Sequence, residues 1–251
     1  MLSSHRIPLL YTPQSIVADE GGGGGPDSPA SDWLLNSNGT DSKGASNFTL
    51  NGTYSFDGGA YLNIDGSSES NNFQDGGDVY HGMEDFTVYL WWALNGSIVI
   101  NRAIIGQGEI TGGTSTTRPM WRAYWSSATN LRVLVYDGVT HPDSLPVVNL
   151  TWTPATGATP DLYVFKYDKS ATTLTVRATN NGTFSEASNS SAATMQTKTS
   201  GNGVLGISER PGRSGAKAQN GDYHRLTLYT DVKDSSHDDL IWTHGAEGAA
   251  L

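Results

Sequence analysis

Two short stretches decide the fold: FDGGAYLNI at residues 56–64 and DFTVYLWW at residues 85–92. Along the second stretch Phe86, Val88 and Leu90 alternate with a second, largely aromatic set of side chains. Alternation with period two is the pattern of a β-strand. Because both of its faces are apolar, we expect 85–92 to be a central strand that is covered on both sides.

Short strand patterns separated by turn signals continue along the chain. The predicted strands are 32–35, 48–53, 103–106, 120–125, 131–136, 162–167, 174–179, 204–207 and 223–229. Asn180-Asn181-Gly182 predicts a tight turn, and 235–243 predicts a helix with Ser235 or Ser236 as its N-cap. Two polar connections, 65–83 and 139–160, are expected to be long loops. This pattern indicates an all-β, two-sheet antiparallel jelly-roll sandwich with one short C-terminal helix.

Composition restricts the function classes. The 251 residues include 30 glycines and seven tryptophans, which suits one large, turn-rich β domain with an aromatic core. A net charge of −10 without a basic patch argues against nucleic acid and against anionic lipid as partners. The absence of cysteine excludes disulfides, thiolate zinc sites and cysteine nucleophiles. No stretch has the length of a membrane-spanning helix, so we expect no membrane insertion.

The first 31 residues differ from the rest, and we divide the chain into an arm at 1–31 and a sandwich at 32–251. Five consecutive glycines at 21–25 form a flexible linker, and the apolar residues before it are too few to bury one another. Two interpretations remain, a disordered tail and an extended arm that orders against a larger assembly; we favour the arm. Its expected contact residues are Ile7, Pro8, Leu9, Leu10, Tyr11, Ile16 and Val17.

Several motifs between residues 32 and 245 resemble laminin-G-like domains of the concanavalin A-like lectin and glucanase superfamily. The resemblance is carried, in this order, by FDG at 56–58 with Tyr61, DFTV at 85–88 with Trp91, the hairpin at 162–182, and GDYHRLTLY at 221–229. Each motif is weakly specific, but their order and spacing together support the sandwich. The resemblance implies a fold that is used more often for binding than for catalysis.

Enzymatic activity is not expected. The superfamily includes glycoside hydrolases, which need two carboxylates on either side of the sugar linkage. Laminarinase-type enzymes carry a Glu-x-Asp-x-x-Glu strand, and this sequence has no such spacing. Its six histidines lie in no nucleophile elbow and no zinc-ligand motif. A glycoside hydrolase or lyase remains the less favoured alternative.

Carbohydrate binding would need an exposed aromatic platform beside polar groups. The WRAYW stretch at 121–125 places Trp121 and Trp125 on one strand face and Tyr124 on the other. One of these sets must belong to the core, and the other is available as a platform. We therefore take Trp121, Tyr124 and Trp125 as the candidate carbohydrate-binding residues.

Calcium is the only cofactor considered. The resemblance implies loops whose carboxylates and carbonyls supply the hard oxygen ligands that calcium prefers. The candidate ligands lie in and just after the polar connection at 65–83: Asp75, Asp78, Glu84 and Asp85. The alternative interpretation is a solvated loop held by its own turns.

Together these features predict a non-enzymatic structural protein that displays a lectin-like sandwich and attaches through its arm. By analogy of fold and organisation, we expect a bacteriophage virion protein, either a capsid decoration or a tail-fibre component. Its partners would be other virion proteins and host surface glycans, and a homo-oligomer is compatible with the sequence. The alternative is a free-standing extracellular carbohydrate-binding module.

Overall fold

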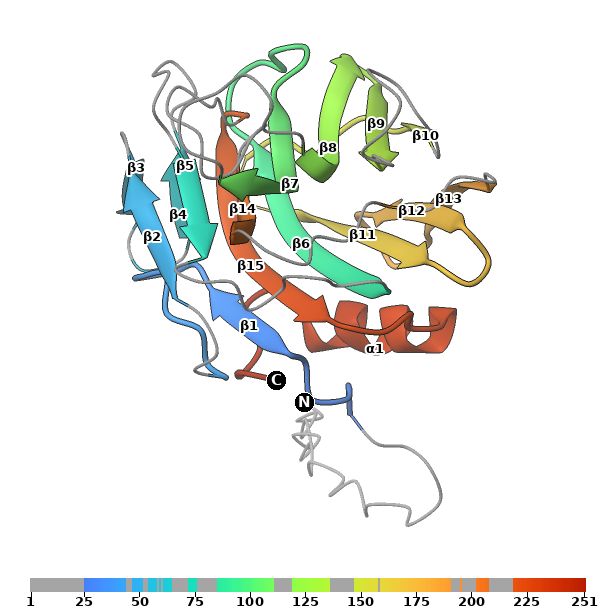
Figure 1. Cartoon of the computed structure of the whole chain (residues 1–251). Helices are drawn as coiled ribbons and strands as arrows, with labels where there is room; N and C mark the ends of the chain where they lie inside the picture. The colour runs from blue at the N-terminus through green and yellow to red at the C-terminus, as the bar shows by residue number, and fades with distance from the viewer. Residues whose placement is uncertain are drawn as a thin grey trace, which may run out of the picture.

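The chain folds into two antiparallel β-sheets that pack face to face, with helix α1 (Ser235–His244) against the outside of one of them (Figure 1). This computed structural model describes residues 25–43, 47–51, 54–57, 59, 61–64, 72–75, 85–110, 119–135, 147–157, 159–190, 195, 202–207 and 219–251. The architecture confirms the predicted jelly-roll sandwich. Among the described residues, no helix is long and apolar enough to cross a membrane.

The first sheet, sheet A, contains the chain's central strand. Its members are β1 (Ser31–Leu34), β3 (Tyr54–Asp57), β4 (Tyr61–Ile64), β6 (Phe86–Leu94), β11 (Asp161–Asp168), β12 (Thr173–Thr179), β13 (Ser185–Ser190) and β15 (Gly221–Tyr229). They run in the order β13-β12-β11-β6-β15-β4-β3, and β1 also pairs with β15. Every residue of β6 is buried, which confirms the expectation of a central strand covered on both sides.

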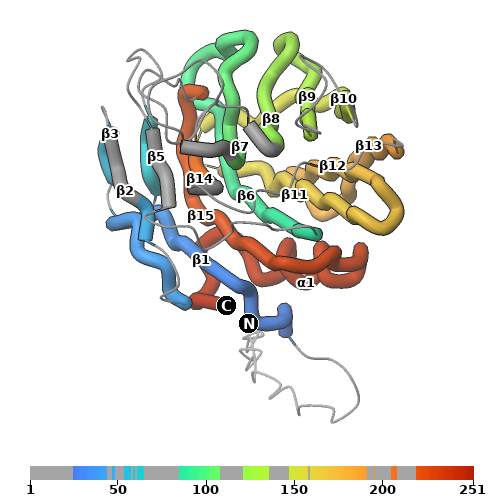
Figure 2. The backbone as a smooth tube through the Cα atoms, viewed as in Figure 1, coloured from blue at the N-terminus to red at the C-terminus, as the bar shows by residue number. Residues whose placement is uncertain are grey.

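The second sheet, sheet B, lies across the core from sheet A. Its members are β2 (Phe48–Asn51), β5 (Asn72–Asp75), β7 (Ala103–Ile110), β8 (Pro119–Ser127), β9 (Asn130–Val135), β10 (Val147–Thr151) and β14 (Asn202–Ile207). Their order is β10-β9-β8-β7-β14-β5-β2. The tube drawing shows β10 at one edge of sheet B and β13 at one edge of sheet A (Figure 2).

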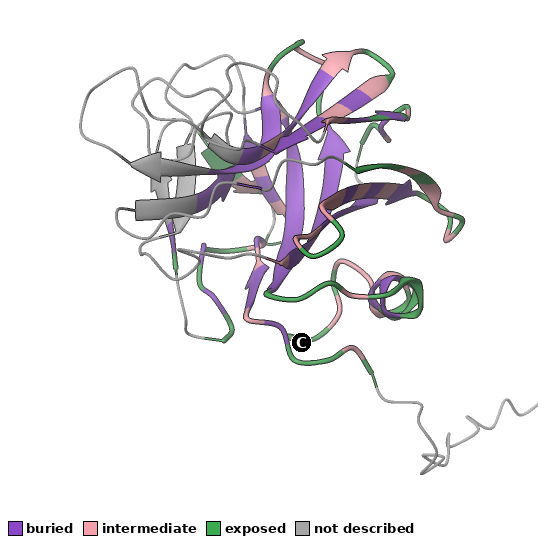
Figure 3. Cartoon of the chain, turned by 45° about the vertical axis from the view of Figure 1, so that its right-hand side comes forward, coloured by how far each residue is buried: buried purple, intermediate pink, exposed green. Residues whose placement is uncertain are grey.

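Aromatic side chains fill the space between the sheets. Trp92, Trp121 and Trp125 have no exposed surface, and the strands that carry them form the buried centre of the molecule (Figure 3). The Trp121 ring stacks on Phe86 with ring centroids 5.0 Å apart and an interplanar angle of 23°. Such pairs contribute about 0.5–1.5 kcal/mol beyond the area that they bury. The core is therefore held by specific ring geometry as well as by its apolar content.

Helix α1 closes the outer face of sheet A. Its Trp242 stacks on Trp91 of β6, with ring centroids 5.3 Å apart. The N-cap is Asp234, whose carboxylate accepts a hydrogen bond from the backbone N–H of His237 at 2.9 Å. The expectation of Ser235 or Ser236 as the cap is wrong, because the extended residue immediately before them already supplies the acceptor.

A buried network of charges lies beneath the helix. Asp238 is fully buried and accepts hydrogen bonds from Lys166 Nζ at 2.7 Å and from the Tyr89 hydroxyl at 2.8 Å, and it also pairs with Arg177. Burial lowers the pKa of Lys166 and raises that of Tyr89. Because a buried carboxylate needs such partners, the network ties α1 to β6, β11 and β12.

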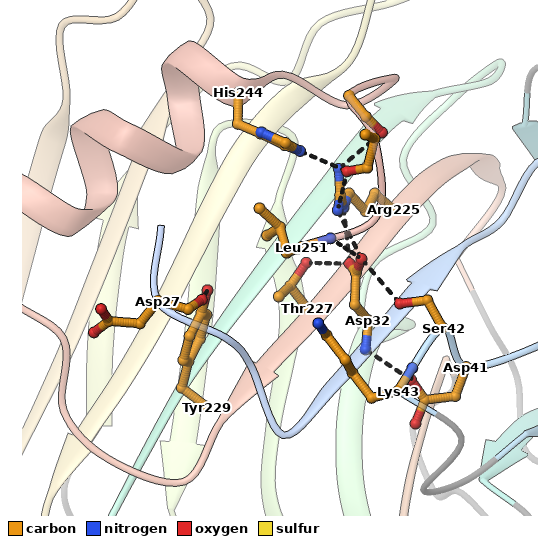
Figure 4. Close-up of polar contacts among 12 residues, drawn as sticks. Asp27, Asp32, Asp41, Ser42, Lys43, Arg225, Thr227, Tyr229, His244 and Leu251 are labelled. Carbon is orange, nitrogen blue, oxygen red and sulfur yellow. Dashed lines mark hydrogen bonds and ion pairs between the residues drawn. The ribbon is translucent and has the colours of Figure 1, made fainter. Parts of the chain in front are cut away.

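The two ends of the described chain meet at a second buried ion pair (Figure 4). Arg225 of β15 donates from Nε and Nη2 to the two oxygens of Asp32, at 2.8 and 2.7 Å. Asp32 also accepts hydrogen bonds from the Thr227 hydroxyl and from the backbone N–H of Leu251. Both charged residues are almost fully buried. The pair therefore joins the first strand, the last strand and the C-terminus.

The sequence pattern missed three strands, β5, β10 and β13. β5 lies within the connection at 65–83 and β10 within that at 139–160, so these connections are not simple loops. β13 has the sequence SEASNS and follows the tight turn at Gly182, whose φ of 89° confirms the turn prediction. Both β10 and β13 are edge strands that pair with one neighbour; β10 also places Val148 and Leu150 in the core, whereas β13 has no comparable apolar face.

Replacing Arg225 by Met keeps most of the side-chain bulk but leaves Asp32 buried without its counter-charge. We expect the free energy of unfolding to fall by about 3–5 kcal/mol, measured by equilibrium urea unfolding. Lys233→Met is the matched control, because it breaks a pair with Asp27, whose side chain is 69% exposed and screened by solvent. Equal losses in the two variants would show that the buried pair has no special role.

Candidate functional site

The outer face of sheet B brings polar and aromatic residues together on β8, β9 and β10. In β8 the residues Trp121, Ala123 and Trp125 point into the core, so Arg122 and Tyr124 point outward. The register then sets their neighbours. Arg122 lies opposite Gly106 of β7 and Leu134 of β9, and Tyr124 lies opposite Arg132. Val147 and Asn149 of β10 complete these two rows. We call this set the Arg122 face: Gly106, Arg122, Tyr124, Arg132, Leu134, Val147 and Asn149.

The three predicted carbohydrate-binding residues are not exposed platforms. Trp121 and Trp125 belong to the inter-sheet core, where Trp121 Nε1 donates to the side-chain oxygen of Gln107 at 3.1 Å. Tyr124 faces outward but is only 5% exposed. The prediction that one of these rings offers a stacking surface is wrong, because neighbouring side chains cover the outward ring as fully as the core covers the others.

The outer face of β8 presents Arg122 where an exposed aromatic ring was expected. The Arg122 guanidinium lies over the Tyr124 ring, with Cζ 4.5 Å from its centroid. Below it Tyr124 packs with Ala103, Leu134 and Val147 in a small apolar cluster. The sequence held the signal for this arrangement, since alternation along 121–125 places residues 122 and 124 on one face. The prediction rested on the aromatic residues alone and therefore did not include Arg122.

The end of the face beyond Tyr124 is polar and partly exposed. Ser126, Asn130 and Thr151 follow on the outward side of β8, β9 and β10, and Thr151 and Asn149 are exposed. Amide, hydroxyl and guanidinium groups at adjacent positions can hydrogen-bond to the ring hydroxyls of a sugar. None of the three strands contains an aspartate or a glutamate.

A second cluster lies on the outer side of sheet A, where Tyr61, Asp57, His224 and Glu247 contact one another. The Tyr61 hydroxyl donates to Asp57 at 2.7 Å, which raises the pKa of Tyr61 to about 12. Its ring packs on His224, whose Nδ1 contacts Glu247 at 3.1 Å. Tyr61 thus stays protonated at neutral pH and serves as a donor within the fold.

The described tryptophans leave little aromatic surface for a ligand. All seven lie in the described residues and none is exposed; Trp152 and Trp242 are half-buried. No tryptophan therefore offers an exposed platform for a sugar ring. Tyr54, which is 40% exposed, lies on the edge strand β3.

The predicted calcium ligands are only partly described. Asp78, Glu84 and the side chain of Asp75 lie outside the described residues. Asp85 accepts a hydrogen bond from the backbone N–H of Lys169 at 2.7 Å, so one of its oxygens braces the turn between β11 and β12. Within the described part of the chain, no group of three or more histidine or acidic residues could hold a metal ion.

The arm residues named from the sequence, Ile7 to Tyr11 with Ile16 and Val17, also lie outside the described residues. The described part of the arm begins at residue 25 and runs along β15. There the Tyr229 hydroxyl donates to the backbone carbonyl of Asp27 at 2.8 Å, and Ala30 donates to the carbonyl of Leu228. The arm therefore leaves the sandwich beside α1 and the C-terminus (Figure 1).

One buried carboxyl has the perturbed pKa that often accompanies catalysis. Burial raises the pKa of Asp161, which is fully enclosed. Its Oδ2 accepts from Trp152 Nε1, the Tyr163 hydroxyl and the backbone N–H of Ala155, all within 2.9 Å. Because no surface of Asp161 is accessible, the contacts brace the loop after β10 and leave no room for a substrate.

Comparison with known proteins identifies the fold and no closer relationship. No family model and no curated protein matches the chain. The sialidase of Trypanosoma rangeli in complex with sialic acid is 11% identical with a TM-score of 0.61, over 85% of this chain and 32% of the sialidase. The VIP36 exoplasmic/lumenal domain, bound to calcium and Man2, is 10% identical with a TM-score of 0.53, over 84% of this chain and 92% of that one.

A third similar structure is the CBM40 domain of the Ruminococcus gnavus IT-sialidase bound to α2,3-sialyllactose. It is 20% identical with a TM-score of 0.49, over 65% of this chain and 84% of that one. The likeness to the VIP36 domain and the T. rangeli sialidase, at such low identity, establishes the fold alone. The chain shares with these two structures a two-sheet antiparallel jelly-roll fold.

Truncation of Trp121 to Ala tests its assignment to the core. Removing the ring leaves a cavity against Phe86, so we expect the free energy of unfolding to fall by about 3–5 kcal/mol in urea titrations. Tyr54→Ala at the exposed edge is the control and should change stability far less. A Trp121 variant as stable as the parent protein would contradict the core assignment.

Proposed function

We propose that this chain is a non-catalytic glycan-binding protein and that the Arg122 face is its binding surface. The observation that carries the proposal is the difference between the two outer faces. On sheet A, Trp242 of α1 packs onto the apolar residues of β6 and β11. On sheet B, the outward cluster around Tyr124 contains only residues of sheet B among those described, and guanidinium, amide and hydroxyl groups surround it.

Two further points support glycans as the ligand class. The fold is shared with the VIP36 domain, which binds Man2, although fold alone does not determine function. In addition, Arg132 lies opposite Asn149, and Thr151 follows two residues along β10. Hydrogen-bonding groups therefore lie at adjacent positions on a sheet surface, which suits a chain of sugar rings. Calcium binding by this chain is also a proposal, so glycan binding should be measured both with added calcium and with a chelator.

The setting that we propose is a virion. In this proposal the N-terminal arm attaches the sandwich to other capsid or tail proteins and the Arg122 face points toward host glycans. The support is geometric: the arm emerges beside α1 and the C-terminus, whereas β8 to β10 lie at the opposite end of the molecule (Figure 1). A free-standing carbohydrate-binding module is the alternative.

Glycan binding can be tested on a glycan array with a double variant of the face. Asn149→Ala with Thr151→Ala removes two exposed hydrogen-bonding side chains, each worth about 0.5–1.5 kcal/mol, so binding should weaken at least about fivefold. Asn181→Ala with Thr183→Ala makes the same two changes on the exposed turn after β12 and should leave binding intact. Equal effects of the two pairs would remove the Arg122 face from the proposal.

The role of the arm can be tested by deleting residues 1–24, which keeps the contacts of Asp27 and Ala30. The truncated protein should unfold at the same temperature as the full chain, because its cooperative core is complete. It should fail to join virions produced from the genome that encodes this chain, as measured by co-sedimentation. Normal incorporation of the truncated protein would contradict the attachment role.

A further inference from the structure

Arg122 is an arginine whose hydrogen-bonding capacity the fold leaves unused. It is half-buried, and its Nε is shielded from solvent without a hydrogen-bond partner. Its guanidinium lies over the Tyr124 ring, with Cζ 4.5 Å from the ring centroid. Within the described part of the chain, no carboxylate pairs with it. A guanidinium carries five N–H donors and no acceptor, so it can be satisfied only by acceptors from outside the fold.

Arg225 shows what a satisfied arginine looks like in the same chain. It donates to both oxygens of Asp32 and to the backbone carbonyls of Gly248 and Ala249. A buried donor that lacks such acceptors costs free energy, and the cost is larger when the donor is charged. Among the described residues, Arg122 has no such acceptor.

The distribution of charge also favours an external acceptor for Arg122. The chain has a net charge of −10, yet β8, β9 and β10 contain two arginines, Arg122 and Arg132, and no acidic residue. Gly106 stands directly opposite Arg122 on β7, so the residue of that strand paired with Arg122 has no side chain. The Arg122 face is thus a local positive site on an acidic protein.

We propose that the ligand of the Arg122 face is an acidic glycan, in which a carboxylate or sulfate of one sugar binds the Arg122 guanidinium. This inference rests on the proposed function. Oxyanions of these two kinds accept paired N–H donors in the plane of the guanidinium, and arginine is the side chain best suited to that geometry. The Tyr124 ring holds the guanidinium plane from below, and Arg132 adds a second positive charge one row away.

Neutral sugars would not meet this requirement. A hydroxyl oxygen can accept a hydrogen bond from the guanidinium, but it carries no charge and does not match the paired N–H donors as the two oxygens of a carboxylate or sulfate do. Hydroxyl groups would also leave the positive charge uncompensated in a half-buried position. The exposed Asn149 and Thr151 would then bind the neutral hydroxyls of the same saccharide, while Arg122 selects for its charge.

The test compares matched glycans on the parent protein, Arg122→Gln and Lys43→Gln. The array carries each glycan core in a neutral, a carboxylated and a sulfated form, so the two sources of the oxyanion are separated. Lys43→Gln removes the same charge from an exposed turn next to β1 and serves as the control. Circular dichroism and thermal unfolding confirm that each variant is folded.

We expect the parent protein to bind carboxylated or sulfated glycans in preference to their neutral forms. Arg122→Gln should weaken that binding about 10- to 100-fold, whereas Lys43→Gln should not. Binding should also weaken as salt rises, because the interaction is ionic. Arg122→Lys keeps the charge but not the paired donors, and should recover only part of the affinity.

The opposing outcomes are distinct. Equal binding of neutral and acidic forms, unchanged in Arg122→Gln, would overturn the acidic-glycan inference and leave the proposed function intact. If acidic forms are preferred but Arg122→Gln and Lys43→Gln lose equal affinity, the preference reflects net charge alone. This result would also overturn the acidic-glycan inference. Binding to no glycan in any form would overturn both proposals.

Discussion

The packing of aromatic rings between the two sheets is the constraint on which the rest of the structure depends. Because successive residues of a strand point to opposite faces, placing Trp121 and Trp125 in this core fixes Arg122 and Tyr124 outside it. A shift of β8 by one residue would drive an arginine into the core and expose two tryptophans. The ring packing thus determines the chemistry of the outer surface as well as the register of sheet B.

The two outer faces use charge in opposite ways. On the sheet A side, Asp32 and Asp238 are fully buried and each is surrounded by donors, so their charges hold chain ends and helix in place. Such pairs stabilise only when every partner is present, which makes them structural. On the sheet B side, Arg122 contacts an aromatic ring, and its buried Nε has no hydrogen-bond partner among the described residues. Arginine thus has two roles: Arg225 is paired within the fold on the sheet A side, whereas Arg122 is available to a ligand on the sheet B side.

The sequence predicted those parts of the fold that local patterns encode. Period-two alternation located β6 and β8, and the glycine at 182 located the turn after β12. Polar β13 escaped because its stability comes from pairing with β12 rather than from its own side chains. The pair of Asp32 with Arg225 joins residues 193 apart in the chain, and no local pattern can reveal such a contact. The candidate residues from the sequence and the proposed Arg122 face both lie on β8, but the sequence prediction named the aromatic residues and not the outward Arg122 between them.

The distribution of charge also orients the molecule. Exposed carboxylates of Asp27, Asp231 and Glu247 lie near the arm, α1 and the C-terminus, whereas β8 to β10 carry arginine without acid. Fields of exposed charges are screened over about 8 Å at physiological salt, so each end of the molecule acts electrostatically on its own. A polyanionic surface would therefore repel the arm side and attract the Arg122 face. If the arm is attached as proposed, this distribution of charge would orient the Arg122 face outward, so the charges and the proposed attachment are consistent with each other.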